Sequence, residues 1–565
     1  MKAIKAAVLL AILAAGLQAQ GHKYYLEQGR SMVVSRGGIV AASQVLASQA
    51  GATILDKGGS AIDAAIAANA VLGVTEPMMN GVGGDLLAII WDAKAKKLYG
   101  LNSSGWSPKG LTIPVLAQKG VKGRPPIHSI HLVTVPGAVA GWDALRTKFG
   151  KLPMKDLLTP AIYYADEGVP IAERSASLWA TDGARLTDLK EFMRVFMPAG
   201  KAPVPGQIWQ NREYAATLRL IAEHGRDGFY KGATAEKLLK FSNEMGGTMV
   251  AEDLEKFEPE WVEPISATYH GWTVYELPPT GQGIAALNML NIMEQFPIAQ
   301  YGQNSAKALH VEIEAKKLAY SDLTKFVGDP RFAQLPVKEM LSKELAVNRA
   351  AMIDENRASC KVMPSDLLTK LKEVGNDTTY LTVVDKDGNI ISLIQSLYAE
   401  FGTGLVVPGT GMILHNRGGL FDFEPGNVNS LAGRKRPQTT IIPAFMEKGD
   451  TKVGFGIMGG YNQAQAHAQF VSNVADFGFN IQAAMEAPRF TKGSFDGCDV
   501  SIESRIPEAT RNELKARGHD LRVVEAFSES MGRGNVVMVD GNGVKFAASD
   551  PRADGAAIPQ SPSIR

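Results

Sequence analysis

The sequence predicts a layered fold in which helices and β-sheets are mixed along the whole chain. Strand-like apolar runs occur before residue 92 and again after residue 378, whereas residues 140–375 mostly show the three- and four-residue apolar spacing of helices. Hydrophobic residues make up 45% of the 565 residues and charged residues 21%, which is typical of a globular protein with a buried core. The length is compatible with several domains or with one large layered domain.

The first elements are expected to be a strand, two helices and a second strand, at 32–34, 38–56, 61–73 and 86–91. Gly58 and Gly59 end the first helix, and Ser60 is a favourable N-cap for the second. The second helix has small residues on nearly all sides. We therefore expect it to be buried and closely packed against its neighbours.

The middle of the chain is expected to be largely helical, with 305–326 and 337–353 as examples. The pattern changes to strands from Thr378 onward. Strands are expected at 379–385, 390–394, 441–446 and 452–457, and a helix at 463–476. The turn between the first two of these strands contains Asp387-Gly388, and an Asp-Gly pair flanked by alternating apolar residues is a strong hairpin signal.

The first 19 residues are predicted to be a secretory signal peptide. Lys2 and Lys5 form a basic start, the apolar run 6–15 is too short to span a bilayer, and Ala19 ends an acceptable cleavage site. A retained membrane anchor is the alternative. Because no later stretch has 18 unbroken apolar residues, we expect the mature protein to be exported, periplasmic or secreted, and not held in a membrane.

Several classes of function are disfavoured by composition and spacing. Lys and Arg number 59 against 58 for Asp and Glu, and a net charge of +1 argues against a nucleic-acid-binding protein. Cys360 and Cys498 can form one bridge, although two free or buried thiols are the simpler expectation. No His, Cys, Asp or Glu spacing suggests a metal site, and Pro278-Pro279 interrupts the dinucleotide-like run 281–286. We expect no metal and no organic cofactor.

A polar turn leads directly into the strand that begins at Thr378. A threonine at the start of a strand can simply be a buried residue. If the Asp377–Thr378 bond is cut, however, Thr378 gains a free α-amine that can deprotonate its own Oγ, directly or through one water. The pKa of an α-amine, roughly 7.7–8.0, suits that role near neutral pH.

Short motifs along about residues 30–560 point together to one family. Asp377-Thr378-Thr379 is followed by Thr382-Val383-Val384-Asp385, and the other motifs are Val74-Thr75-Glu76-Pro77, Asn80-Gly81-x-Gly83-Gly84-Asp85, Val135-Pro136-Gly137, Phe401-Gly402-Thr403-Gly404, Lys435-Arg436-Pro437, Met458-Gly459-Gly460, Ala487-Pro488-Arg489 and Ser549-Asp550-Pro551-Arg552. Jointly they resemble the γ-glutamyltransferase (glutathione hydrolase) family, and the first motif resembles its self-processing site.

The resemblance implies an α+β fold, a four-layer αββα sandwich of the N-terminal-nucleophile hydrolase type. It also implies that the precursor cleaves itself between Asp377 and Thr378. The large subunit (20–377) and the small subunit (378–565) would remain together as a heterodimer within one αββα domain, and Thr378 would be the nucleophile.

The same resemblance assigns roles to five further residues. Ser396 would steady the nucleophile, and the backbone amides of Gly459 and Gly460 would form the oxyanion hole, since glycine leaves its N–H groups unobstructed. Thr439 and Thr440 would hold the carboxylate of the substrate. From the sequence alone, the glycine pair also fits a plain turn and the threonine pair fits ordinary strand residues.

The departures from the family concern recognition of the substrate. Ser104 stands where the family has the Arg that pairs with the glutamate α-carboxylate, and a hydroxyl cannot replace a bidentate guanidinium. Leu420 replaces the Asp that holds the α-ammonium, Tyr398 replaces an Asn that contacts the amino group, and Tyr380 replaces a His. Arg417 is a candidate carboxylate partner from a new direction, or else a structural arginine.

The sequence thus predicts a self-processing amidohydrolase that acts on the γ-glutamyl groups of glutathione and related amides through a threonyl acyl-enzyme, with transfer to an acceptor amine as a second outcome. The alternative is an amidase or acylase that acts on a dicarboxylic monoamide or glutaryl-type amide without an α-amino group. A third reading is a non-catalytic binding protein on a hydrolase scaffold. The presence of Thr378, Ser396 and Gly459-Gly460 argues against it.

Overall fold

The computed structural model describes residues 28–364 and 377–562, so the leader expected at 1–19 lies outside the described residues. Two seven-stranded sheets form the centre of the molecule. The first has the order β1-β20-β19-β15-β14-β9-β8, made of Val33–Ser35, Lys545–Ser549, Gly534–Val539, Thr451–Ile457, Ala444–Lys448, Trp272–Glu276 and Ile265–Tyr269. The second has the order β21-β2-β10-β11-β3-β4-β7, made of Ala556–Pro559, Ile39–Ala42, Asp377–Val384, Ile390–Tyr398, Asp85–Asp92, Lys97–Ser103 and Glu260–Val262.

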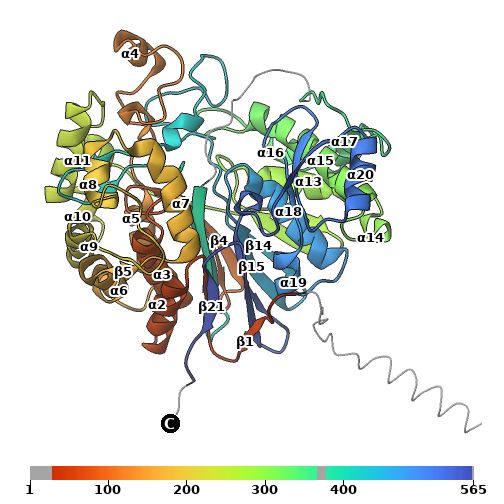
Figure 1. Ribbon diagram of the computed structural model, residues 1–565, viewed down its shortest axis with the longest axis horizontal. Coiled ribbons are helices and arrows are strands. Elements are labelled where there is room, and N and C mark those ends of the chain that lie inside the picture. Colours follow the sequence, from red (N-terminus) through yellow and green to blue (C-terminus); the bar gives the residue numbers. More distant parts are fainter. Residues whose placement is uncertain (1–27, 365–376, 563–565) are drawn as a thin grey trace, which may run out of the picture.

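The two sheets pack face to face, and helices cover both outer faces (Figure 1). β10 contacts β15 and β19 of the other sheet. On one outer face α2 (Val45–Asp56) and α3 (Ala61–Thr75) lie against β2 and β10. On the other face α13 (Gly283–Met293) and α18 (Asn462–Ala475) lie against β9 and β15, and α15 (Ala306–Phe326) packs on α13. The αββα sandwich implied by the resemblance is confirmed.

Further helices extend the α3 side of the sandwich into a large helical layer. α6 packs on both α3 and α9. The longer helices of this layer are α5 (Ala138–Phe149), α6 (Met154–Glu167), α7 (Glu173–Gly183), α8 (Lys190–Phe196), α9 (Arg212–His224) and α11 (Gly232–Glu244).

Helix α3 confirms the expectation of a fully buried helix. All 15 of its residues are buried. It begins with a capping box, in which the Ser60 hydroxyl accepts from the Asp63 amide at 3.2 Å and the Asp63 carboxylate accepts from the Ser60 amide at 2.8 Å. Small side chains let this helix lie close to β10 and β11.

The hairpin predicted at Asp387-Gly388 is present between β10 and β11. The Asp385 carboxylate closes its turn by accepting from the amides of Asp387 and Asn389, both at 3.0 Å. β11 runs four residues beyond the expected end at residue 394, to Tyr398, and all of it is buried. Because the strand lies between two other strands and two packed layers, its polar residues are buried too, which an apolar pattern does not reveal.

Three segments differ from the expectations. The stretch 38–56 contains strand β2 before helix α2. The helix expected at 337–353 is divided into α16 (Val337–Met340) and α17 (Lys343–Ala350), because the Ser342 hydroxyl caps the second helix by accepting from the Leu345 amide at 3.1 Å. A small sheet that the sequence did not suggest is formed by β16, β17 and β18, at Phe490–Thr491, Asp499–Glu503 and Asp520–Val524, with α19 (Ile481–Glu486) and α20 (Glu508–Ala516) nearby in the sequence.

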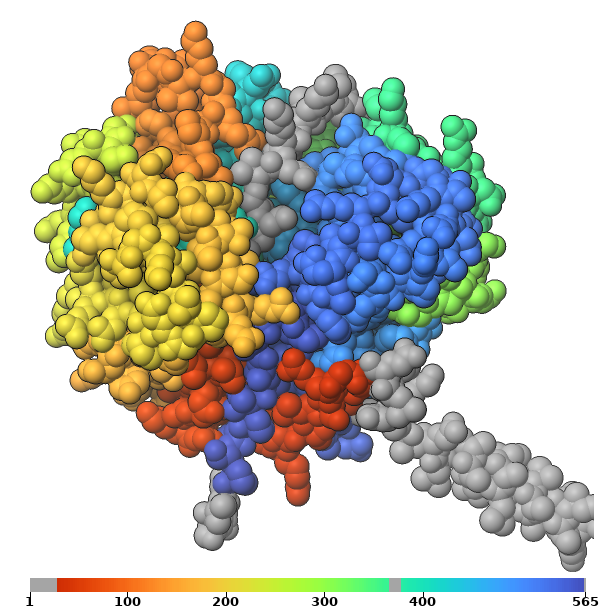
Figure 2. Space-filling view, viewed as in Figure 1, coloured from red at the N-terminus to blue at the C-terminus, as the bar shows by residue number. Residues whose placement is uncertain are grey.

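Both sheets combine strands from before residue 377 with strands from after it. β10 and β11 lie between β2 and β3, while β9 lies beside β14 and β1 beside β20. In the space-filling view the first described residues (red) lie next to the last (dark blue), because β2 pairs with β21 (Figure 2). The two expected subunits therefore share one core.

Cys360 and Cys498 form a disulfide, with their Cα atoms 4.8 Å apart. The simpler expectation of two thiols is wrong, and the bridge that the sequence left open is the outcome. Within the described ranges, no helix has the length and apolarity needed to cross a membrane.

Candidate active site

Thr378 lies at an irregularity in the pairing of β10 with β11. Asp377 is paired with Tyr398 and Thr379 with Gln395, so the register shifts between these two pairs. A single residue of β10, Thr378, is thereby set against two residues of β11. Such bulges bend a strand and redirect a side chain, and they are frequent beside active sites.

Two side chains meet the Thr378 hydroxyl, which is fully buried. Thr378 Oγ1 donates to Ser396 Oγ at 3.3 Å, and Gln463 Nε2 donates to Thr378 Oγ1 at 3.4 Å. Ser396 Oγ also accepts from the Tyr398 amide at 2.8 Å, which fixes its position. The structure therefore brings Ser396 to Thr378, as the resemblance implied, and adds Gln463, which the sequence did not single out.

The Gly459-Gly460 pair forms the turn that enters helix α18. Both residues have positive φ values, 129° and 56°, which favour glycine. Their carbonyls accept from the amides of Asn462 and Gln463 at 2.9 and 3.2 Å. Within residues 28–364 and 377–562, neither glycine amide donates a hydrogen bond. Two unobstructed N–H groups, one turn of chain from Gln463, are suited to stabilise a developing oxyanion.

Gln282 connects this glycine turn to the threonine pair. Its side-chain amide donates to the carbonyls of Gly460 and Thr440, at 2.7 and 2.6 Å. Its backbone amide donates to the Thr439 carbonyl at 3.2 Å. The dinucleotide-like run 281–286 therefore contributes Gln282, which holds the glycine turn and the threonine pair in place.

Thr440 belongs to a buried polar group centred on Arg417, in the short 3-10 helix Arg417–Leu420. Arg417 donates to both carboxylate oxygens of Asp85, at 2.9 and 3.1 Å, and both residues are fully buried. Its remaining nitrogen, Nη1, donates to Thr440 Oγ1 at 2.9 Å. Its guanidinium lies 4.9 Å from the centre of the Tyr398 ring. The charge of Arg417 is therefore already balanced inside the protein.

The remaining threonine of the pair, Thr439, is tied into the backbone. Its Oγ1 accepts from the Ile441 amide at 3.4 Å and its amide donates to the Thr280 carbonyl at 3.0 Å. The two threonines thus differ: the hydroxyl of Thr440 accepts from an arginine side chain, whereas that of Thr439 accepts from a backbone amide.

Two of the positions that depart from the family, Ser104 and Leu420, stand where charged residues were expected and carry no charge. The Ser104 hydroxyl donates to Asn102 Oδ1 at 2.7 Å, so it is already used. Leu420 is 4% exposed and belongs to the same apolar cluster as Tyr398. At neither position is there a charged partner for an amino-acid head group.

The basic run 434–436 is held by protein acids and carbonyls. Arg436 pairs with Glu260 at 2.5 Å and donates to the Ser104 carbonyl at 2.8 Å. Arg434 pairs with Glu252 at 2.8 Å. These arginines therefore have partners of their own and do not replace the missing guanidinium at residue 104.

A buried acid–histidine pair contacts the end of β15, just before the Gly459-Gly460 turn in the sequence. The Ile457 amide, at the end of β15, donates to His467 Nε2 at 3.0 Å. The proton of His467 is therefore on Nδ1, which donates to Glu276 Oε1 at 2.7 Å. Burial raises the pKa of the Glu276 carboxyl. This pair connects β9, β15 and α18.

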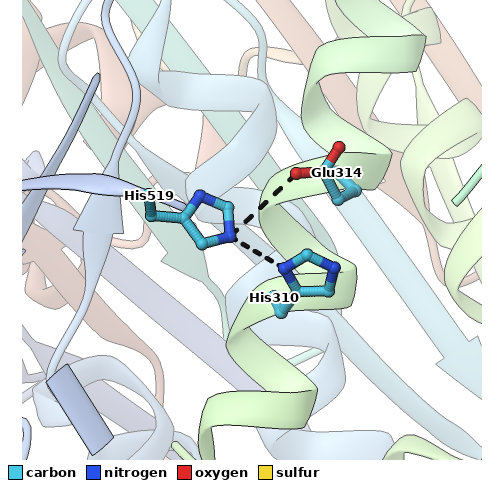
Figure 3. A group of neighbouring side chains, drawn as sticks. All are labelled: His310, Glu314 and His519. Atoms are coloured by element: carbon cyan, nitrogen blue, oxygen red, sulfur yellow. Dashed lines mark hydrogen bonds and ion pairs between the residues drawn. The ribbon is translucent and has the colours of Figure 1, made fainter. Parts of the chain in front are cut away.

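The described ranges contain a possible ligand set that the sequence did not reveal: His310 and Glu314 on α15, and His519 (Figure 3). His310 Nδ1 lies 2.8 Å from His519 Nε2, and His519 Nε2 lies 4.0 Å from Glu314 Oε1. His310 Nε2 donates to the Asp354 carbonyl at 2.8 Å and Glu314 pairs with Lys317 at 2.5 Å. Within the described residues, His310 and Glu314 thus have partners in the protein, whereas the buried Nδ1 of His519 has no hydrogen-bond partner.

Known proteins resemble the chain over nearly its whole length. The sequence model of the gamma-glutamyltranspeptidase family matches residues 47–560. The glutathione hydrolase-like YwrD proenzyme of Bacillus subtilis is 36% identical, over 93% of this chain and 99% of its own. The oxamate amidohydrolase proenzyme of Klebsiella pneumoniae is 33% identical, over 93% and 98%. The crystal structure of cephalosporin acylase from Bacillus halodurans superposes with a TM-score of 0.87 at 39% identity, over 96% and 99%.

The names of these relatives refer to different compounds: glutathione, oxamate and cephalosporin. A family match over most of the chain, together with the αββα sandwich, settles the classification that the motifs suggested. The chain belongs to the γ-glutamyltranspeptidase family of hydrolases.

Proposed function

We propose that the chain is an exported, self-processing amidohydrolase whose nucleophile is Thr378. The observation that carries the proposal is the convergence of Ser396 and Gln463 on the buried Thr378 hydroxyl. The turn that leads into the helix of Gln463 contains two glycine amides that have no partner in the described structure. Three of the elements of acyl transfer are then together: a nucleophile, hydrogen-bonding groups that orient it, and an oxyanion site.

The first reaction is cleavage of the precursor. Thr378 Oγ1 attacks the carbonyl carbon of Asp377, the bond to the Thr378 nitrogen breaks, and the hydroxyl proton moves to that nitrogen. A water then hydrolyses the resulting ester, which releases the Asp377 carboxylate and restores the hydroxyl. The products are the subunits 20–377 and 378–565. The names of two relatives, both called proenzymes, support this step.

The second reaction is amide hydrolysis by the freed Thr378. Its new α-amine accepts the proton of Oγ1 as that oxygen attacks the substrate carbonyl, and later passes the proton to the departing amine. The amides of Gly459 and Gly460 stabilise the negative oxygen of the tetrahedral intermediate. Water hydrolyses the acyl-enzyme; an amine that takes its place gives transfer instead.

For the substrate, we favour an amide whose acyl side lacks an α-amino group, such as a dicarboxylic monoamide or a glutaryl amide. The specific observation is the neutral pair Ser104 and Leu420, together with the bidentate pairing of Arg417 to Asp85. An α-ammonium group bound beside these residues would lose its hydration shell without gaining an oppositely charged partner, which would weaken binding. Thr440 remains a hydroxyl suited to a single carboxylate.

Two experiments test these proposals. Thr378→Ala is expected to remain a single inactive chain on a denaturing gel, whereas Thr378→Ser keeps a hydroxyl and is expected to cleave. Normal cleavage of the alanine variant would contradict the assignment of Thr378 as the nucleophile.

The substrate proposal is tested by comparing kcat/KM for matched γ-glutamyl and glutaryl anilides on processed enzyme. We expect little or no preference for the γ-glutamyl compound, and a preference of a hundredfold or more contradicts the substrate proposal.

Export is proposed from the leader at 1–19 and from the disulfide. Cys360 and Cys498 are bonded in a chain that has no other cysteine. Disulfides persist in oxidising compartments such as the periplasm and are rare in the cytosol. Fractionation of cells is expected to find the protein outside the cytoplasm, shortened by the leader.

A further inference from the structure

The disulfide joins two parts of the chain that lie on opposite sides of the proposed cleavage site. Cys360 follows helix α17 and belongs to the large subunit, whereas Cys498 directly precedes β17 and belongs to the small subunit. The two cysteines are 138 positions apart, and the bond between Asp377 and Thr378 falls between them.

Backbone hydrogen bonds hold the two cysteine loops together independently of the disulfide. The Gly497 amide donates to the Cys360 carbonyl at 2.9 Å, and the Ala358 amide donates to the Arg517 carbonyl at 2.7 Å. The Asp520 amide also fixes the far side of the bridge by donating to the Cys498 carbonyl at 2.8 Å. The two sulfur atoms are therefore brought together by the fold.

The surroundings of the disulfide form a contact between the two sides of the cut. His310 and Glu314 on α15 face His519, which precedes β18, and the two histidines share a hydrogen bond of 2.8 Å (Figure 3). An apolar cluster continues the same contact, with α15 on one side and the small sheet and α20 on the other: Ala306, Leu309, Ile313, Phe490, Val500, Ile502, Ile506 and Leu514.

We propose that the Cys360–Cys498 disulfide links the large and small subunits covalently in the processed enzyme. The inference rests on the proposed cleavage before Thr378. Cleavage removes the peptide connection between α17 and β10, and the disulfide then becomes the covalent connection between the chains. Held near its new end by this bond, the large subunit stays docked at a high effective concentration.

Formation of the bond is an oxidation with a defined partner. The thiols of Cys360 and Cys498 together lose two electrons and two protons as the S–S bond forms. A protein disulfide of the exporting compartment accepts them and is reduced to a dithiol. Cys360 is exposed and Cys498 is half-buried, so the pair is accessible to that oxidant and to added reductants.

The test is electrophoresis of the exported, full-length protein after denaturation with a thiol-blocking reagent. We expect one band near the 60.5 kDa of the whole chain, less the leader, without reductant, and two smaller bands with dithiothreitol. Cys360→Ser and Cys498→Ser are expected to give the two smaller bands under both conditions. Two bands from the wild-type protein without reductant overturn the disulfide link.

A second arm separates the link from the cleavage. One band with and without dithiothreitol means that cleavage failed, which counts against the proposed function. The link is then tested in Thr378→Ala carrying a specific protease site within 365–376. After cutting by that protease, a band that separates only on reduction supports the link, and immediate separation overturns it.

Discussion

At the scale of single residues, the position of Thr378 depends on contacts that are distant in the sequence. Ser396 comes from the neighbouring strand, and Gln463 comes from helix α18, 85 residues further along the chain. The sequence could single out Thr378 as the candidate nucleophile because it follows a polar turn at the start of a strand within a family motif. The contacts of Gln463 and Asp85 could not be predicted, because the local sequence around a buried polar residue does not show which distant residue it will contact.

Gln463 is expected to position the nucleophile. Its Nε2 donates to Thr378 Oγ1 at 3.4 Å while its Oε1 accepts from the Ile442 amide at 3.0 Å. A net hydrogen bond contributes about 1 kcal/mol, and about 1.4 kcal/mol corresponds to a factor of ten. Gln463→Leu should therefore lower kcat by roughly three- to tenfold and slow self-cleavage, with KM nearly unchanged.

Gln465→Leu is the matched control for that variant. Gln465 lies on the same helix, but its side chain accepts from the Lys492 amide at 2.9 Å and donates to the Lys492 carbonyl at 3.2 Å. Both variants leave a buried amide unpaired, so both lose some stability. Equal effects of the two variants on kcat would show that Gln463 acts only through folding.

Leu420 offers a test of how the substrate is recognised. An aspartate there restores a carboxylate near the place of an α-ammonium, and a hydrogen bond between charged groups contributes about 1.5–3 kcal/mol. Leu420→Asp should raise the ratio of kcat/KM for γ-glutamyl over glutaryl anilides by roughly ten- to a hundredfold. Leu420→Asn, similar in shape but neutral, should change the ratio far less. An unchanged ratio in the aspartate variant would place the ammonium elsewhere.

At the scale of elements, long or strongly patterned segments were predictable and short ones were not. Helix α3 and the β10–β11 hairpin lie where capping and turn residues indicate. Strand β2 was hidden, because its four residues, Ile39–Ala42, merge into an Ala-rich helical run. The small sheet β16–β18 also escaped detection, since strands of two to five residues carry little periodicity.

The capping box of α3 gives an element-scale prediction. The Ser60 hydroxyl satisfies the Asp63 amide at the start of a helix that is buried along its whole length. Loss of an N-cap hydroxyl costs about 1 kcal/mol. Ser60→Ala should lower the free energy of unfolding by that amount in urea titrations of the uncleaved Thr378→Ala precursor, a single chain. Ser60→Thr retains the hydroxyl and should lose little; equal losses in the two variants would argue against the cap.

At the scale of the whole molecule, the parts of the chain before and after residue 377 both contribute strands to each central sheet. β10 and β11, which follow the expected cleavage site, lie between β2 on one side and β3, β4 and β7 on the other, all of which precede it. The sequence could suggest that both subunits form one domain only through the family resemblance, because strand order depends on long-range pairing. The same long-range packing brings Cys360 next to Cys498, whereas the sequence spacing could not decide whether the two cysteines are bonded.

Burial also makes the stability of the whole molecule depend on pH. Glu312, on α15, is buried, and its desolvation, together with the nearby charge of Asp476, raises the pKa of its carboxyl from 4.5 to about 8. The folded state therefore binds this proton more tightly than the unfolded state does. The resulting stabilisation is fully present below pH 4.5 and is lost progressively as the pH rises to about 8.

Glutamine at residue 312 stays neutral at every pH, so Glu312→Gln should remove this contribution to the pH dependence of the unfolding free energy. Since one pKa unit corresponds to about 1.4 kcal/mol, the variant should gain up to a few kcal/mol of unfolding free energy over the wild-type residue between pH 5 and pH 8. The measurement is urea unfolding of the Thr378→Ala precursor with and without the substitution at several pH values. Glu344→Gln, at an exposed position of α17, is the control and should leave the curve unchanged. Parallel curves for Glu312→Gln and its parent would mean that Glu312 is charged in the folded protein, and that water or a cation reaches it at the α15 interface.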